Sequence, residues 1–213
     1  LGGVNALGVD HRNVAGVEDA VSYIAKLRQT KDKSTLPIGR RVVVVGGGMT
    51  AIDIASQAKR LGAEDVTIVY RRDAAAMKAS AFEQELAQTD GVLIRHWLRP
   101  IAVRSENGRL SGVELAYTRD EGGRLVDDGR HLSLDCDQLF LAIGQTMLAN
   151  DIGDGELALD GGRIRVDAER KTSLDKVWAG GDCIAGGQDL TVAAVEDGKQ
   201  AAIAIDRALR ASR

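Results

Sequence analysis

The sequence has little cysteine and no long apolar run, and both shortages exclude classes of protein. Of its 213 residues only two are cysteine, Cys136 and Cys183, and they form no CxxC pair. This excludes a disulfide framework and favours a reducing, cytoplasmic setting. No apolar run approaches the roughly 18 residues of a membrane-spanning helix, so we expect no membrane segment.

Neither the charged residues nor the histidines form the patterns that nucleic-acid binding, metal binding or nucleophilic catalysis requires. The net charge is −3 with both signs interspersed, which gives no footprint for nucleic acid or a membrane surface. The three histidines, His11, His96 and His131, stand far apart in unrelated contexts. The sequence has no Cys/His cluster and no Gly-x-Ser-x-Gly elbow. We therefore expect no metal site and no catalytic nucleophile.

Glycine, by contrast, is abundant, and one glycine-rich stretch stands between a strand pattern and a helix pattern. The stretch is "VVVVGGGMTAIDIASQA", residues 42–58. The valine run is typical of a parallel strand that is buried on both faces. A helix is expected over residues 50–61, ended by Gly62, and a second buried strand over residues 65–70. Strand, glycine loop, helix and strand within about 30 residues predict a βαβ unit.

The loop itself fits the pattern G-x-G-x-x-A, with Gly46, Gly48 and Ala51 at its fixed positions. The first glycine would turn the chain out of the strand, and the second would let a pyrophosphate approach the backbone. The small Ala51 would let the helix pack on the strands, while Met49 and Thr50 present N–H groups at its start. No Gly-Lys-Ser/Thr follows, which argues against a P-loop. The alternative is a glycine turn that serves packing alone.

Two arginines, Arg71 and Arg72, follow the second strand of the βαβ unit. A site for NAD usually has a carboxylate there, whereas guanidinium groups pair with the 2′-phosphate of NADPH. The pair therefore favours NADPH over NADH. Asp73 lies close enough to leave NADH open, and exposed arginines after a strand are often only solvated.

The remaining patterns predict an α/β fold in which a small antiparallel insert interrupts the nucleotide-binding domain. We expect an N-terminal loop and helix segment over residues 1–36, a Rossmann-like domain over 37–145, and a C-terminal piece over 146–213. Helices are predicted at 17–27, 80–88 and 191–209, antiparallel strands at 92–105, 109–119 and 130–135, a buried strand at 137–144, and short strands at 161–167 and 176–182.

A second nucleotide-site pattern stands in the C-terminal piece, where Gly180, Gly181 and Asp182 precede the long helix that begins at Thr191. The glycines would let a ligand approach, and the carboxylate could accept hydrogen bonds from sugar hydroxyls. A helix start aimed at a flavin would stabilise the negative charge that forms on reduction. The alternative is a helix-capping loop with Asp182 in a turn.

Taken together, "VVVVGGGMTAIDIASQAKRLGAEDVTIVYRRD", "FLAIGQT" and "VWAGGDCIAGGQDLTVAAVEDGKQAA" resemble the flavoprotein reductases with two dinucleotide-binding domains. This family includes the glutamate synthase small subunit and the NAD(P)H-oxidising part of dihydropyrimidine dehydrogenase. The resemblance implies that NAD(P)H passes hydride to FAD, and that electrons then cross iron–sulfur clusters to a substrate-reducing partner subunit. Positioning of the two cofactors then supplies the catalysis, with no catalytic protein residue.

The resemblance also implies roles for particular residues. The glycine loop would hold the pyrophosphate and the arginine pair the 2′-phosphate of the nicotinamide nucleotide. The other implied positions are Ala142, Ile143 and Gly144 at the crossing between domains, Gly181 and Asp182 at the FAD ribityl–phosphate region, and Gln188, Leu190, Thr191, Val192 and Ala193 at the isoalloxazine edge.

The sequence departs from this family in two respects. It holds no second G-x-G-x-x-G after an N-terminal strand, and two isolated cysteines cannot hold a [4Fe–4S] cluster. We therefore expect a fragment, with a whole NAD(P)H-binding domain and only the C-terminal part of an FAD-binding domain. The FAD and iron–sulfur portion of the same polypeptide would then be its partner. The alternative is a nucleotide-sensing or scaffold module without redox activity.

Overall fold

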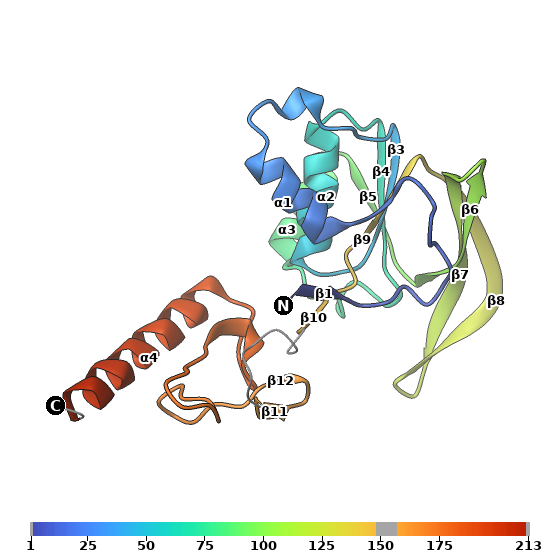
Figure 1. The fold of residues 1–213 in the computed structure, drawn as a ribbon. Coiled ribbons are helices and arrows are strands. Elements are labelled where there is room, and N and C mark those ends of the chain that lie inside the picture. Colours follow the sequence, from blue (N-terminus) through green and yellow to red (C-terminus); the bar gives the residue numbers. More distant parts are fainter. Residues whose placement is uncertain (1, 148–156, 212–213) are drawn as a thin grey trace. The chain divides into compact units, whose positions relative to one another are not determined.

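A computed structural model describes residues 2–147 and 157–211 of the chain (Figure 1). The chain divides into two compact units. Residues 4–144 form the larger unit, and the smaller one joins the first three residues to the segment that begins at Gln145.

The larger unit contains a parallel sheet whose five strands follow the order β2-β9-β3-β4-β5. Its elements are β2 (Val17–Asp19), α1 (Ala20–Gln29), a 3₁₀ turn (Lys33–Thr35), β3 (Arg41–Val45), α2 (Met49–Arg60), β4 (Asp65–Val69), α3 (Ala81–Thr89), β5 (Val92–Arg95), β6 (Leu98–Glu106), β7 (Arg109–Glu121), β8 (Arg124–Asp135) and β9 (Gln138–Leu141).

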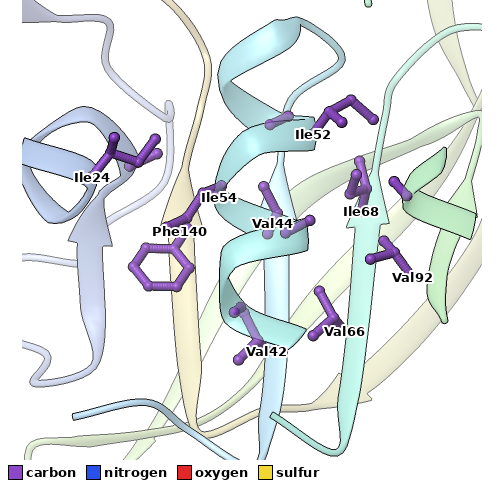
Figure 2. Packing of buried hydrophobic residues seen from close by; sticks show 14 of the residues in the cluster. Ile24, Val42, Val44, Ile52, Ile54, Val66, Ile68, Val92 and Phe140 are labelled. Carbon is purple, nitrogen blue, oxygen red and sulfur yellow. The ribbon is translucent and has the colours of Figure 1, made fainter. Parts of the chain in front are cut away.

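The parallel sheet is covered on both faces. On one face, α1, α2 and α3 pack against inward-pointing side chains such as Val42, Val44 and Phe140 (Figure 2). On the other face, Val43 and Val45 pack against the antiparallel strands β6, β7 and β8 (Figure 1). Because successive strand side chains alternate between faces, a sheet buried on both sides requires an unbroken apolar run. The predicted α/β class, with a parallel sheet and a small antiparallel insert, is confirmed.

The antiparallel insert is a three-stranded meander in the order β6-β7-β8. A two-residue turn, Asn107–Gly108, joins β6 to β7, and both of its residues have positive φ. That conformation matches the twist of a hairpin, which explains the Asn-Gly pair. β8 begins at Arg124, six residues before the predicted strand, because it continues the pairing with β7 as far as the next turn.

Two predictions about elements of this unit were wrong. Residues 17–19 form strand β2 beside β9, and the helix begins at Ala20 because Asp19 caps it by accepting the Ser22 N–H at 2.8 Å. The predicted strand 92–105 is two strands, since the chain turns at Trp97 with a φ of 60°. The first of them, β5, joins the parallel sheet.

The smaller unit pairs β1 (Gly2–Val4) with β10 (Gln145–Met147), and β11 (Leu159–Asp160) with β12 (Arg163–Ile164). A 3₁₀ turn (Gly181–Cys183) precedes the long helix α4 (Thr191–Ala211). The strand predicted at residues 176–182 is replaced by a single bridge between Lys171 and Trp178. Positive φ angles at Lys176 and Gly181 prevent a continuous extended strand there.

Candidate functional site

The glycine turn follows β3 at the carboxyl edge of the parallel sheet. Gly46 has a φ of 148°, and a Cβ added to it would stand 2.2 Å from the carbonyl oxygen of Ala142, just after β9. Its N–H donates to the carbonyl of Val69, at the end of β4, at 3.1 Å. The fold itself therefore requires glycine at position 46, whether or not a ligand binds, because the turn lies tightly between two neighbouring strands.

Gly48 is different, because nothing in the structure requires glycine there. It is the N-cap of α2 with φ −100° and ψ −178°, and a Cβ added to it would meet no atom within 4 Å. It makes no side-chain cap, and the first turn of α2 carries no acidic residue. Position 48 thus opens onto free space in front of a helix N-terminus, where the backbone N–H groups carry positive partial charge.

Backbone donors at this turn are unused within the described chain. The N–H groups of Gly47, Gly48, Met49 and Thr50 find no acceptor among residues 2–147 and 157–211, whereas that of Ala51 donates to the Gly48 carbonyl at 3.0 Å. Met49 and Thr50 are at least partly exposed. Ala51 is fully buried in the core beneath the helix, as the third position of the pattern requires. The turn can therefore donate several hydrogen bonds to an anion.

Arg71 and Arg72 lie just beyond the carboxyl end of β4, and both are exposed. Their backbone is fixed: the Arg71 carbonyl accepts the Thr118 hydroxyl at 2.7 Å, and the Arg72 carbonyl accepts the Trp97 N–H at 3.1 Å. Neither guanidinium forms an ion pair or hydrogen bond within the part of the chain that the structure describes. The two cations are therefore held on a fixed backbone with their charges free.

The side chain of Asp73, next to the arginine pair, forms a hydrogen bond within its own loop. Its carboxylate accepts the N–H of Ala76 at 2.8 Å and forms no ion pair with a described residue. An aspartate in this position does not neutralise the arginine pair.

Ala142, Ile143 and Gly144 follow β9 at the same carboxyl edge of the sheet. Ala142 lies against Gly46, and its N–H donates to the Val45 carbonyl at 2.8 Å. Asn5 fixes the other two, since its side chain donates to the Ile143 carbonyl at 3.1 Å and its N–H to the Gly144 carbonyl at 3.2 Å. The structure therefore brings this predicted trio to the edge that carries the glycine turn. Its predicted role at a domain crossing stays a prediction.

The Gly180–Asp182 pattern in the smaller unit is organised by a carboxylate that the sequence patterns did not single out. Asp197 of α4 is 8% exposed, accepts the Gly181 N–H at 2.8 Å, and accepts the Arg170 guanidinium at 2.7 Å. A Cβ at Gly180 would stand 2.6 Å from that of Asp197. The hydrogen bond from the Gly181 N–H, with that from Arg170, lowers the pKa of Asp197.

Asp182 itself keeps its carboxylate available. Its carbonyl accepts the Arg163 guanidinium, but no described residue hydrogen-bonds or pairs with its carboxylate. Gln188 and Ala193 line one shallow hollow that also includes Arg170 and Asp197. Leu190 immediately precedes α4, Thr191 and Val192 begin it, and all three side chains are exposed. The structure thus places this predicted set around the start of one helix and one fixed loop.

Other chemistries find no site in the described parts of the chain. No three side chains of His, Cys, Asp or Glu gather there in a way that could hold a metal ion. No helix among the described residues combines the length and apolarity needed to cross a membrane. A hollow at the amino edge of the sheet, lined by Arg40, Arg41, Glu64, Asp65 and Asp137, has its arginines paired with its carboxylates.

A family model described as "Pyridine nucleotide-disulphide oxidoreductase" matches residues 4–198. The chain belongs to this family. The family is one of NAD(P)H-dependent flavoproteins, which agrees with the resemblance that the glycine turn and the Gly-Gly-Asp motif predicted.

Two of the curated relatives are named as a subunit and as a chain of an enzyme. The chain is 37% identical over 183 residues to the NADP(+)-dependent formate dehydrogenase subunit beta of Moorella thermoacetica, covering 81% of this chain and 25% of the relative. It is 33% identical over 218 residues to the glutamate synthase [NADPH] small chain of Escherichia coli, covering 92% and 46%. The chain therefore spans less than half the length of these relatives.

Solved structures of other proteins share the fold. The thioredoxin reductase of T. acidophilum matches with a TM-score of 0.75 and 19% identity over 94% of this chain and 61% of that one. The enzyme of Lactococcus lactis matches with a TM-score of 0.75 and 22% identity over 96% and 62%. At this level of sequence identity, the matches show the fold but not the activity or the ligands.

The two cysteines of this chain form no CxxC motif, and each has its own surroundings. Cys136 is fully buried, and burial raises the pKa of its thiol to about 12. Cys183 donates its thiol hydrogen to the Gly180 carbonyl at 3.1 Å. The two belong to different units and have 46 residues between them in the sequence.

Proposed function

We propose that residues 4–144 bind NADPH, and that the chain is the NADPH-binding part of a flavin-dependent oxidoreductase. One observation carries the proposal. Backbone donors at Gly47–Thr50 and the guanidinium groups of Arg71 and Arg72, all without a partner among the described residues, stand at the carboxyl ends of adjacent parallel strands. Ligands of open α/β sheets bind at that edge. A dinucleotide with an added phosphate presents an anion to each of the two groups.

The residues would divide the recognition between them. The N–H groups at the start of α2 would donate to the pyrophosphate, with no side chain between, since Gly48 leaves the approach open. Arg71 and Arg72 would each offer a planar fork of donors to the 2′-phosphate. Their backbone is already fixed by Thr118 and Trp97, so less ordering is needed when the ligand binds.

FAD is the second cofactor that the family implies, and the smaller unit offers part of a site for it. A bound flavin would accept the hydride of NADPH. In this chain, the Asp182 carboxylate has no described partner and would accept hydrogen bonds from a ribityl or ribose hydroxyl. Asp197 would hold the Gly180–Cys183 loop in place for that contact. The N-terminus of α4 would stabilise negative charge beside it.

Electrons would then leave through iron–sulfur clusters of the same polypeptide to a partner subunit that reduces the final substrate. The names of two relatives, a beta subunit and a small chain, support the partner subunit. The iron–sulfur route rests on the family resemblance alone. The names of these relatives also specify NADP(+) and NADPH, which agrees with two arginines that form no ion pair with a described residue.

Calorimetric titration of this chain with NADPH and with NADH tests the proposal. We expect both nucleotides to bind, and NADPH to bind at least about tenfold more tightly, because charge-assisted hydrogen bonds to a phosphate are worth about 1.5–3 kcal/mol each. Circular dichroism establishes that the protein used is folded. Folded protein that binds neither nucleotide contradicts the proposal.

A further inference from the structure

Tyr70 lies between β4 and the arginine pair, and its ring packs on the middle glycine of the turn. A Cβ added to Gly47 would stand 2.5 Å from two carbon atoms of that ring. Gly47 has no positive φ, so its backbone would accept a side chain if space allowed. Glycine at position 47 therefore makes room for Tyr70. Gly46, by contrast, makes room for the Ala142 carbonyl, and Gly48 has no atom against it.

The loop after Tyr70 is tied back to the same glycine. The Gly47 carbonyl accepts two N–H groups from the end of the loop, that of Lys78 at 2.9 Å and that of Ala79 at 3.2 Å. The hydroxyl of Tyr70 donates to the Ala76 carbonyl, inside the loop, at 2.8 Å. Met77 and Ala79 are buried, which anchors this end of the loop in the core beneath α2 and α3.

These contacts join the two halves of the proposed nucleotide site. The glycine turn and the segment that carries Arg71 and Arg72 are 20 or more residues apart in sequence, and Tyr70 contacts both. In one nucleotide molecule, the pyrophosphate and the 2′-phosphate are separated by a fixed number of bonds. A guanidinium fork forms two good hydrogen bonds only when it is correctly placed and oriented, so a small shift of the arginine segment weakens the contact.

We propose that Tyr70 is a positioning residue for nucleotide selectivity: it fixes the arginine segment relative to the glycine turn, and so sets the preference for a 2′-phosphorylated dinucleotide. The inference rests on the proposed function and adds to it the residue that couples the two phosphate contacts. It predicts an asymmetry, because NADH uses the glycine turn but has no phosphate for the arginines. Loosening the coupling should therefore weaken NADPH binding and spare NADH binding.

The first test is Tyr70→Phe in the 213-residue chain, with dissociation constants measured by calorimetry for NADPH and NADH. The variant keeps the ring on Gly47 and removes only the hydrogen bond to Ala76. We expect NADPH to weaken by about three- to tenfold, the range for one lost hydrogen bond, and NADH to change by less than twofold.

Tyr23→Phe is the matched control for that variant. Its hydroxyl also donates to a backbone carbonyl, that of Pro37, at 2.8 Å, and it belongs to the same unit. Tyr23 lies in the helix layer of the core, away from the glycine turn in sequence, and we expect both dissociation constants to be unchanged. If Tyr70→Phe weakens both nucleotides equally, or leaves their ratio unchanged, Tyr70 has no positioning role. If the wild-type chain binds neither nucleotide, the proposed function fails and this inference fails with it.

A pair of further variants tests the contact between ring and glycine directly. Gly47→Ala puts a methyl group into the ring of Tyr70, so we expect a lower melting temperature and weaker binding of both nucleotides. Adding Tyr70→Ala removes the ring that the methyl group meets. The double variant should recover melting temperature relative to Gly47→Ala, and should still lack the preference for NADPH. A double variant that melts no higher than Gly47→Ala, or one that regains the preference, overturns the inference.

Discussion

Gly46 lies against Ala142 so closely that a methyl group at position 46 would stand 2.2 Å from the Ala142 carbonyl oxygen. Two positions further on, a methyl group at Gly48 would meet nothing within 4 Å. The two glycines that define the nucleotide-binding pattern therefore serve different ends. The fold requires the first, whereas the second would be required only by the nucleotide that we propose binds in front of it.

Gly46→Ala should destabilise the larger unit severely. The new methyl group collides with a backbone carbonyl that belongs to the ordered end of β9, and the φ of 148° is unfavourable for alanine. We expect a loss of about 3 kcal/mol or more in the free energy of unfolding, measured in urea. A loss below about 1 kcal/mol would show that β3 and β9 separate easily at this edge.

Gly48→Ala should give the opposite pattern. Its φ and ψ suit alanine and no atom blocks the methyl group, so the free energy of unfolding should change by less than about 1 kcal/mol. The methyl group would occupy the space through which a pyrophosphate approaches the N–H groups of α2. Binding of NADPH and of NADH, measured by calorimetry, should therefore weaken together by at least about tenfold. Unchanged binding would mean that the ligand does not approach at this glycine.

Sequence patterns predict the parallel sheet well because a run of apolar side chains must be buried on both faces of its strand. Four consecutive valines have no solvent-facing member, and the structure buries Val42 and Val44 on one face and Val43 and Val45 on the other. The same patterns fail at Trp97. Residues 92–105 read as one strand because neither glycine nor asparagine marks the break, yet Trp97 adopts a positive φ there. Its N–H donates to the carbonyl of Arg72, just beyond the neighbouring strand β4, and this bond holds the turn.

The residues of the candidate site also divide into those that a local sequence pattern predicts and those that only contacts between distant segments define. The glycines, Ala51 and the arginine pair follow a fixed local pattern, so their positions could be predicted. Asp197 could not, since it stands beside Glu196 in the sequence and nothing local distinguishes the two acids. Glu196 is exposed, whereas Asp197 is buried because it faces the Gly180–Cys183 loop. Likewise, no pattern indicates that Gly47 is needed for the ring of Tyr70, a contact between segments more than 20 residues apart.

Replacing both Arg71 and Arg72 by alanine should remove the preference for NADPH. Each guanidinium is free of described partners and each would bond to the 2′-phosphate, so we expect NADPH to lose about 2–3 kcal/mol of binding free energy. NADH should lose almost nothing. Calorimetry at two salt concentrations checks both, and the difference between nucleotides should shrink as salt rises, because exposed charges are screened.

Arg40→Ala is the control for that double variant. Arg40 is also exposed, but it pairs with Glu64 at the amino edge of the same sheet. It removes positive charge without touching the proposed site, so both dissociation constants should stay unchanged. Equal losses for NADPH and NADH in the Arg71 and Arg72 variant would show that these side chains do not recognise the 2′-phosphate.

Asp197 should make the Gly180–Cys183 loop sensitive to acid. Hydrogen bonds from the Gly181 N–H and from Arg170 lower the pKa of its carboxyl group in the folded protein. A lowered folded-state pKa contributes stability that is fully present above the unfolded value of about 3.9, and that is lost as pH falls through the folded-state pKa. We therefore expect the loop to be protected near neutral pH and to open progressively below about pH 4.

Hydrogen exchange at the Gly181 amide measures this opening, because that N–H is the one that Asp197 accepts at 2.8 Å. In Asp197→Asn, the charge is lost while an acceptor oxygen remains, so exchange near neutral pH should be faster than in the wild type and its excess acid dependence should vanish. Glu196→Gln is the control, since that side chain is exposed and bonds only to Lys199 and Gln200 on its own helix. Its Gly181 amide should exchange as in the wild type. If both variants alter that amide equally, general helix electrostatics and not the buried carboxylate holds the loop.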